Sequence, residues 1–344
     1  MESTVLPLEG IKILDLSRHI PGPYCTLILG DLGAEVLRVE SFEPVGFHFA
    51  EIKGEKSPAY YAARNPFERN KKSIMLNLKA EEARQIFYKL VEKSDVILEG
   101  FRPGVVKRLG IDYETISKLN PRIIYCSLSG YGQDGPYSAL PGHDPNQIAI
   151  GGALSLIGPR DGSPEFPSNL LADYAGGGLQ AAIGILAALL ARQKTGEGQY
   201  LDVAMLDGVV SLLILEAFQY FTTSKVPRRG ATLTTGLYPF YQVYQTKDAG
   251  YITVDAFEPH FWRNLCKALG CEEFIPYQFD TGDKREEMYN YFSEIFFKQF
   301  FTTHYFIKVE EIKGFCRNKQ DRPEKLEQTL FMANKGFRLL YLNS

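Results

Sequence analysis

The alternation of strands and helices in the first two thirds of the chain is the feature that most restricts its fold. Residues 11–16 have the apolar pattern of a buried strand, residues 24–32 predict an apolar helix that Gly33 ends, and residues 35–40 predict a second strand. Strands joined in this way are typical of a β-α-β unit with parallel strands. Further strands are predicted at 73–78, 95–99, 122–128 and 199–205, with helices at 80–93, 105–109, 179–192 and 207–221. We therefore predict an α/β fold with a doubly wound, Rossmann-like large domain.

A change of composition near residue 224 predicts a domain boundary. Residues 224–236, which include Pro227 and Gly230, have the composition of a linker. Residues 240–245 and 251–256 then predict a β-hairpin, and a helix that carries the only tryptophan, Trp262, is expected to begin near Glu258. The predicted organisation is a large domain at 1–223, a linker at 224–236, a smaller α+β domain at 237–300 and an atypical C-terminal segment at 301–344.

Composition and charge exclude several classes of protein. The net charge of −3 gives no reason to expect a nucleic-acid partner. The five cysteines are odd in number and include no C-x-x-C pair, which favours a reducing, cytoplasmic compartment over disulfides or a metal site. The first residues lack the pattern of a signal peptide, and the longest apolar run, 181–191, is too short for a bilayer. We expect a cytoplasmic protein without a membrane span.

Asp173 is the first candidate for chemistry because three glycines, 176–178, and an apolar helix follow it closely. An aspartate at a helix start can simply cap the helix, which contributes about 1 kcal/mol. Glycines in a row cost conformational entropy, so they indicate an unusual backbone path or the close approach of another group. We therefore expect Asp173 at a helix N-terminus whose N–H groups and dipole could stabilise an oxyanion.

His143 and Glu258 are weaker candidates on sequence alone. A single histidine is more often structural than catalytic, although Asp144 could orient its ring and make it a proton acceptor. Glu258 can equally be an acid that stabilises the start of its helix.

Basic residues at the predicted strand ends indicate a site for a polyphosphate such as a nucleotide. These residues are Arg18, Arg38, Arg69, Lys71, Lys72, Lys79, Arg102 and Arg108.

Several segments resemble the type III CoA-transferase family, which includes formyl-CoA transferase and α-methylacyl-CoA racemase. Residues 8–16 and 32–40 look like the opening of the family. Glu99-Gly100-Phe101-Arg102-Pro103-Gly104 resembles its "ENFRPG" segment, and residues 194–199 look like its "RTGKGQ"-type turn. The resemblance extends from about residue 8 to about residue 295.

The resemblance implies an acyl-CoA thioester as substrate, no prosthetic group, and an interlaced homodimer in which the smaller domain of one subunit caps the site of the other. It implies contacts to CoA from Arg38, Leu76, Lys79, Gly100, Phe101, Arg102, Arg108 and Gly142. It also implies that Asp173 is catalytic, as a nucleophile in the transferases or as one of two bases in the racemases. In the racemases the second base is the histidine of a Gly-His-Asp motif, which His143 matches.

The Gly142-His143-Asp144 and Glu258-Pro259 motifs resemble the racemase branch of the family. Pro145 and Gln147 depart from the racemase pattern, and residues 300–344 match no family motif, which would fit a truncated or frame-altered C-terminus. Three hypotheses stay open. The chain is an epimerase of 2-methyl-branched acyl-CoA thioesters with His143, Asp173 and Glu258 in its site, a CoA-transferase with Asp173 as nucleophile, or an inactive CoA-binding homologue.

Overall fold

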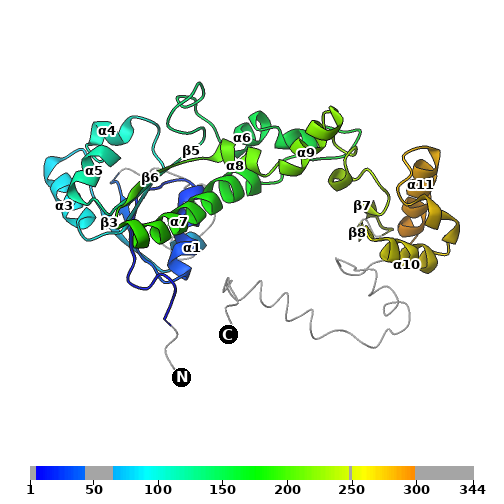
Figure 1. Cartoon of the computed structure of the whole chain (residues 1–344), viewed down its shortest axis with the longest axis horizontal. Coiled ribbons are helices and arrows are strands. Elements are labelled where there is room, and N and C mark those ends of the chain that lie inside the picture. The colour runs from blue at the N-terminus through cyan, green and yellow to red at the C-terminus, as the bar shows by residue number, and fades with distance from the viewer. Residues whose placement is uncertain (1–4, 43–64, 248–249, 299–344) are drawn as a thin grey trace, which may run out of the picture. The chain divides into compact units, whose positions relative to one another are not determined.

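The computed structural model describes residues 5–42, 65–247 and 250–298, so most of the predicted C-terminal segment lies outside the described residues (Figure 1). Contacts within the chain define two compact units. One contains residues 1–154 and 166–218, and the other contains residues 155–165 and 219–344. The break falls inside a helix that precedes the linker predicted at 224–236.

The first unit is built on a six-stranded parallel sheet, which confirms the α/β prediction. Its strand order is β3-β2-β1-β4-β5-β6. Every ladder in this sheet is parallel, so the chain must cross over between neighbouring strands. The strands are β1 (Lys12–Asp15), β2 (Glu35–Glu40), β3 (Lys71–Met75), β4 (Val96–Glu99), β5 (Ile124–Ser129) and β6 (Gln199–Ala204).

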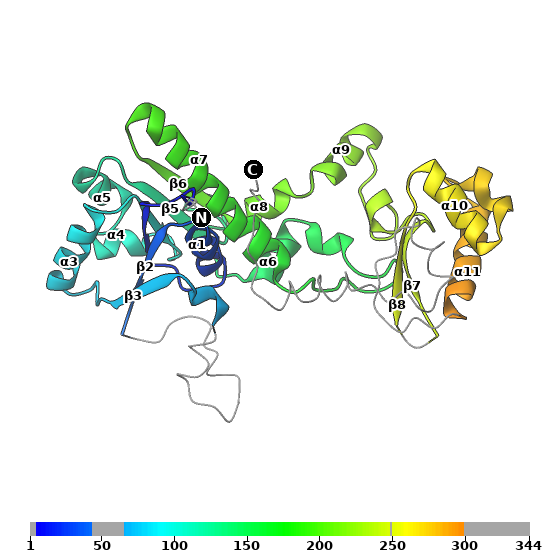
Figure 2. The same cartoon turned by 90° about the horizontal axis from the view of Figure 1, so that it is seen from below.

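Helices cover both faces of the sheet, since successive strand residues point to opposite sides. Ile13 and Leu98 join the core beneath the helices α1 and α7, whereas Leu14 and Ile97 join the core beneath α3. The helices around the sheet can be followed in Figures 1 and 2. The helices of this unit are α1 (Pro21–Asp31), α3 (Glu81–Val91), α4 (Val105–Leu109), α5 (Tyr113–Leu119), α6 (Asp144–Ile150), α7 (Gln180–Thr195) and α8 (Met205–Ser211). Shorter turns are η2 (Pro66–Glu68) and η3 (Ala153–Leu156), and η4 (Leu170–Leu179) is a π-helix that runs directly into α7.

Three predicted elements differ from the structure. The strand predicted at 73–78 is β3, which begins and ends earlier. The helix predicted at 207–221 is two helices, α8 and α9 (Ile214–Thr223), with a bend of 56° between them. The helix predicted at 179–192 begins at Leu170, so Asp173 lies inside a helix rather than before one.

The second unit has its own core. A hairpin of β7 (Tyr241–Gln245) and β8 (Tyr251–Asp255) is antiparallel, as predicted. Phe240, Trp262 and Phe292 pack together at its centre. The remaining elements are η5 (Leu233–Thr235), α10 (Pro259–Leu269), η6 (Glu272–Tyr277) and α11 (Asp283–Phe297). Glu258 occupies the N-cap position of α10 without a side-chain hydrogen bond to the helix, and Pro259 occupies the first turn, where a missing N–H costs nothing.

The helical run Leu170–Thr195 is long and apolar enough to cross a bilayer by length and composition, and 44% of its most apolar window is buried. Its α7 part contributes Ala181, Ile185 and Ala188 to the core against the sheet. Core helices of soluble proteins share this composition. The expected absence of a membrane span stays a prediction.

Candidate active site

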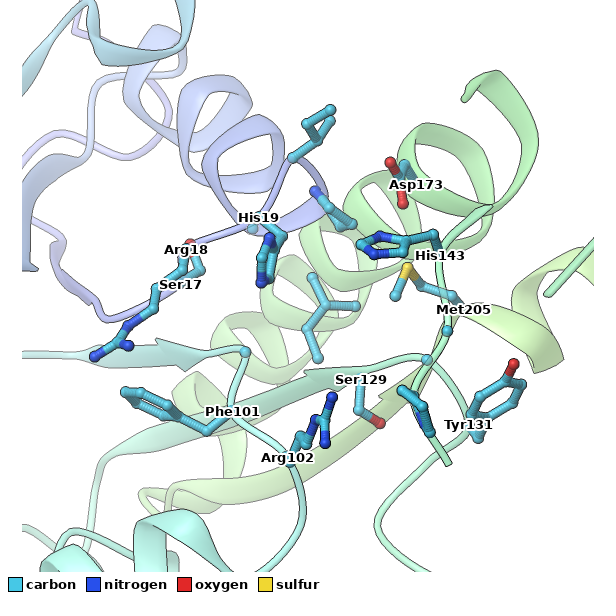
Figure 3. A pocket seen from close by; sticks show the side chains of 18 of the residues that line it. Ser17, Arg18, His19, Phe101, Arg102, Ser129, Tyr131, His143, Asp173 and Met205 are labelled. Atoms are coloured by element: carbon cyan, nitrogen blue, oxygen red, sulfur yellow. The ribbon is translucent and has the colours of Figure 1, made fainter. Parts of the chain in front are cut away.

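A cavity of about 500 Å³ opens at the carboxyl ends of β1, β4 and β5. The strand order reverses between β1 and β4, and ligands of open parallel sheets bind at such a switch point. The loops after the three strands line the cavity together with the start of α8 and one residue of η4. Figure 3 shows His19, His143 and Asp173 among the lining side chains.

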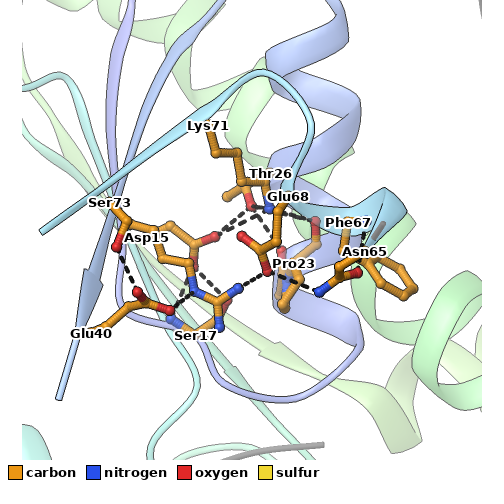
Figure 4. A network of polar contacts seen from close by, with 12 residues as sticks. Asp15, Ser17, Pro23, Thr26, Glu40, Asn65, Phe67, Glu68, Lys71 and Ser73 are labelled. Carbon is orange, nitrogen blue, oxygen red and sulfur yellow. Dashed lines mark hydrogen bonds and ion pairs between the residues drawn. The ribbon is translucent and has the colours of Figure 1, made fainter. Parts of the chain in front are cut away.

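The loop after β1 is fixed by a buried carboxylate (Figure 4). Asp15 is fully buried and accepts hydrogen bonds from the backbone N–H of Ser17 at 2.9 Å, from the Ser17 hydroxyl, and from the Thr26 hydroxyl at 2.5 Å. The Lys71 ammonium lies 3.6 Å from the same carboxylate. This network ties the loop to α1 and β3, so Arg18 and His19 project from a firmly held turn.

The loop after β4 is held by Glu99, which is also buried. Its carboxylate accepts the backbone N–H of Phe101 at 2.7 Å. Burial raises the pKa of Glu99 to about 7, although hydrogen bonds from Ser127 and Phe101 oppose the shift. The Phe101 ring lies 4.9 Å below the Arg18 guanidinium, a cation–π contact that joins the loops after β1 and β4.

His143 stands at the N-terminus of α6, where its backbone N–H donates to Asn146 at 3.0 Å. The expectation that Asp144 orients the His143 ring is wrong. Asp144 Oδ2 instead accepts the backbone N–H groups of Ala172 and Asp173, at 2.7 and 2.9 Å, and Asp144 Oδ1 has no hydrogen-bond partner. Asp144 therefore connects the start of α6 to η4 and fixes the backbone of Asp173.

Asp173 lies half-buried in the first turn of η4. Burial raises the pKa of its carboxyl, and the Asp144 carboxylate adds to the rise. A hydrogen bond from Asn169 at 3.2 Å and the charge of His143 act in the opposite direction. A raised pKa brings an aspartate closer to the range in which it can both accept and donate a proton.

The three glycines after Asp173 serve packing, which corrects their expected role as an oxyanion site. All three are buried inside η4. A Cβ on Gly176 would lie 2.8 Å from the Met205 carbonyl oxygen, and a Cβ on Gly178 would lie 2.8 Å from the Pro21 carbonyl oxygen. The glycines thus let α1 and α8 approach η4 more closely than any side chain would permit.

The residues predicted to contact CoA divide into three groups. Gly100, Phe101, Arg102 and Gly142 line the main cavity. Leu76 and Lys79 line a second cavity of about 200 Å³, which also borders on Arg18 and Phe101. Arg38 and Arg108 line neither cavity, and Arg38 forms ion pairs with Glu40 and Glu68.

Two further predicted basic residues are held by protein carboxylates. Arg69 pairs with Asp31, and Lys71 belongs to the Asp15 network. Glu258, the third predicted catalytic residue, belongs to the second unit, at the N-cap position of α10. Within the described ranges, no cluster of three His, Cys, Asp or Glu residues could hold a metal ion.

His19 is the residue that sequence reasoning missed. Its ring and that of His143 meet edge to face, with the ring centroids 6.4 Å apart. Burial lowers the pKa of His19, and the charges of His143 and Arg18 lower it further. The available signal was its position, directly after the first strand of a predicted parallel sheet.

The parallel sheet has one cavity at its switch point and a second cavity at the ends of β1, β2 and β3. A histidine and an aspartate lie together in the first cavity, and this arrangement defines an α/β enzyme with groups for acid–base or nucleophilic chemistry. The model of CoA-transferase family III matches residues 8–316, and the chain belongs to this family.

Its relatives include both racemases and transferases. The human alpha-methylacyl-CoA racemase is 38% identical over 293 residues, which cover 85% of this chain and 72% of that protein. The human succinyl-CoA:glutarate CoA-transferase is 38% identical over 276 residues, 79% of this chain and 61% of that protein. The solved structure of a CAIB/BAIF family protein from Brucella suis has a TM-score of 0.67 at 30% identity, covering 95% of this chain and 82% of that chain. The chain is therefore an enzyme of the racemase or CoA-transferase kind.

Proposed function

We propose that the protein epimerises 2-methyl-branched acyl-CoA thioesters by moving the α-proton between His143 and Asp173. The observation that carries this proposal is that both side chains line one cavity although they come from different elements. A two-base reaction needs an acceptor and a donor at the same carbon. A transferase needs only Asp173, so the presence of His143 favours the epimerase.

In this mechanism one of the two groups acts as the base, either as neutral His143 or as ionised Asp173. The other group carries a proton. The base breaks the α-carbon–hydrogen bond, and the electron pair remains on the thioester as an enolate. The protonated group then delivers its proton to the opposite face of the same carbon. The raised pKa of Asp173 suits a carboxyl that must carry a proton in one direction of the reaction and release it in the other.

We propose that the CoA portion of the substrate runs from the main cavity into the second one. Arg18 and Phe101 border both cavities, and Lys79 supplies a positive charge to the second. Arg102 supplies a positive charge to the main cavity. CoA enters as part of the substrate in this scheme, and none of the proposed steps uses a prosthetic group.

A CoA-transferase is the second candidate function, and the equal identity to a human transferase favours it. Asp173 would attack the thioester carbon and displace the CoA thiolate, which gives a mixed anhydride. The thiolate would then attack the aspartyl carbonyl, release the first acid and leave an aspartyl-CoA thioester for the acceptor acid.

We also propose a homodimer in the cytoplasm. The α9 helix exposes several large apolar side chains: Ile214 is 77% exposed, Phe218 67% and Phe221 80%. Contiguous apolar side chains on a surface mark a site of protein association. A second copy of the chain is the partner that the family resemblance implies.

The deciding experiment follows the α-hydrogen of a chiral 2-methylacyl-CoA in deuterated water without an acceptor acid. We expect exchange and loss of optical purity in the wild type, and a fall of roughly 10²-fold or more in His143→Ala and Asp173→Asn. CoA binding by both variants is the control for folding.

The contrary outcome is equally clear. If no α-hydrogen exchanges, while CoA passes to an added acid and hydroxylamine traps Asp173, the protein is a transferase. CoA binding with neither activity would support the inactive homologue.

A further inference from the structure

The main cavity contains a second imidazole whose role the epimerase mechanism does not assign. His19 comes from the loop after β1, and His143 comes from the start of α6, but the two rings meet at 6.4 Å between centroids and 88° between planes (Figure 3). Both rings line the same cavity. His19 and His143 are far apart in the sequence, so only the folded sheet brings their rings together.

Asp144 does not take the usual place of a carboxylate beside the His143 imidazole. A histidine base is commonly oriented by a carboxylate on its far nitrogen. Asp144 is adjacent in sequence, but its Oδ2 is engaged by the backbone of Ala172 and Asp173 and its Oδ1 has no hydrogen-bond partner. His19 is therefore the titratable side chain whose ring packs against that of His143.

His19 is also suited to take up a proton. Burial and the nearby charges of His143 and Arg18 lower its pKa, so its ring is neutral near neutral pH. A charge on His143 is among the causes that disfavour a charge on His19. His19 retains an exposed surface through which a proton can pass to water.

The position of His19 is well defined. Its backbone carbonyl accepts the N–H of Gly22 at 3.2 Å, and Ser17 two residues earlier is held by the buried Asp15 carboxylate. A ring on such a turn keeps its place during turnover better than one on a free loop. The 6.4 Å between the two ring centroids also leaves room for a water molecule to bridge the two side chains.

On the basis of the proposed function, we propose that His19 is a proton relay that resets His143 between turnovers. After His143 removes the α-proton, an N–H bond of its imidazolium breaks and an N–H bond forms on neutral His19. His19 then releases the proton to water, both rings are neutral again, and Asp173, which has given its proton to the substrate, takes up a proton from water. His19 touches no reacting carbon in this scheme and acts through His143, so it is a positioning residue rather than a catalytic one.

This role predicts a particular split of the kinetic constants in His19→Phe and His19→Gln. Resetting of the free enzyme limits turnover only at saturating substrate. We therefore expect kcat and KM for epimerisation to fall together, on the order of tenfold, while kcat/KM stays within about twofold of the wild type. Added imidazole should restore kcat in His19→Phe, which keeps a ring of similar shape without titrating.

His260→Phe is the matched control, because it removes an exposed imidazole on α10 that lines neither described cavity. It should leave both constants unchanged, and thermal unfolding of each variant checks the fold. A fall in kcat/KM equal to the fall in kcat, or unchanged kinetics in both His19 variants, would overturn the relay alone. If wild-type protein exchanges no α-hydrogen in deuterated water, the epimerase function fails, and the relay fails with it.

Discussion

At the scale of single residues, Glu99 is the buried acid with the clearest consequence for pH. Its carboxyl has a pKa of about 7 in the folded protein, against 4.5 as its ordinary value. Between these values the folded protein holds a proton that the unfolded chain has lost, so the free energy of unfolding falls as pH rises through this range. The free energy of unfolding falls by about 3 kcal/mol in total, because each pH unit between the two pKa values contributes about 1.36 kcal/mol.

The variant Glu99→Gln tests this pH dependence because its amide does not titrate and its oxygen can still accept the N–H of Phe101. Urea unfolding at pH 5 and pH 8 should show the variant gaining about 2 kcal/mol relative to the wild type at the higher pH. Glu81→Gln is the control. Hydrogen bonds from Gln85 and Arg84 lower the pKa of the exposed Glu81, so it stays ionised across this range. Parallel curves for wild type and Glu99→Gln would contradict the buried, protonated acid.

At the scale of secondary structure, the contact between η4 and α8 sets the position of Asp173. Gly208 of α8 packs on Gly176 of η4 so closely that a Cβ on Gly208 would lie 2.1 Å from the Gly176 carbonyl oxygen. That atom belongs to the backbone and cannot rotate away. Any side chain at Gly208 must therefore push the two helices apart and move the Asp173 carboxyl.

Gly208→Ala should consequently destabilise the protein by about 3 kcal/mol or more and reduce activity at the same time. Gly184→Ala is a matched control inside α7, because a Cβ there would meet only the Leu201 side chain, at 3.6 Å. This control should stabilise the protein by about 0.5–1 kcal/mol through helix propensity. Chemical unfolding of both variants measures the difference. Equal stability of the two would mean that the contact can relax without cost.

Elements that depend on local pattern were predictable from the sequence, and elements that depend on tertiary contacts were not. The apolar runs of β1, β2, β4 and β5 predicted buried parallel strands because both faces of the sheet are covered. The short helices α5 and α6 were missed, since seven residues carry little helical periodicity. The three glycines suggested a helix start, but they are buried in a π-helix whose packing requires them.

At the scale of the whole molecule, Asp173 and His143, which the sequence suggested as a pair, line one cavity, but the sequence could not show what surrounds them. Asp144 is next to His143 in sequence, yet it binds the backbone of η4. His19 is distant in sequence, yet its ring packs against His143. Loops after different strands meet only once the sheet has formed, so single-sequence reasoning cannot rank these neighbours.

The proposed homodimer predicts that the apolar side chains of α9 lie in the interface between the two copies. Phe218 and Phe221 of α9 are 67% and 80% exposed, and burying them against a second copy would remove large apolar surfaces from water. Phe218→Glu and Phe221→Glu should each shift the protein from dimer to monomer in sedimentation velocity, because an unpaired charge opposes burial. Ile86→Glu on α3 changes a residue that is 46% exposed and should leave the dimer intact.

Activity distinguishes a dimer that completes the site from one that only stabilises the fold. If the second unit of one copy caps the cavity of the other, the monomeric variants should lose epimerisation even when thermal unfolding shows an intact fold. If the monomers keep full activity, residues of the first unit suffice, and Glu258 has no part in the site. A wild type that sediments as a single chain would contradict the dimer itself and would require another partner for the apolar surface of α9.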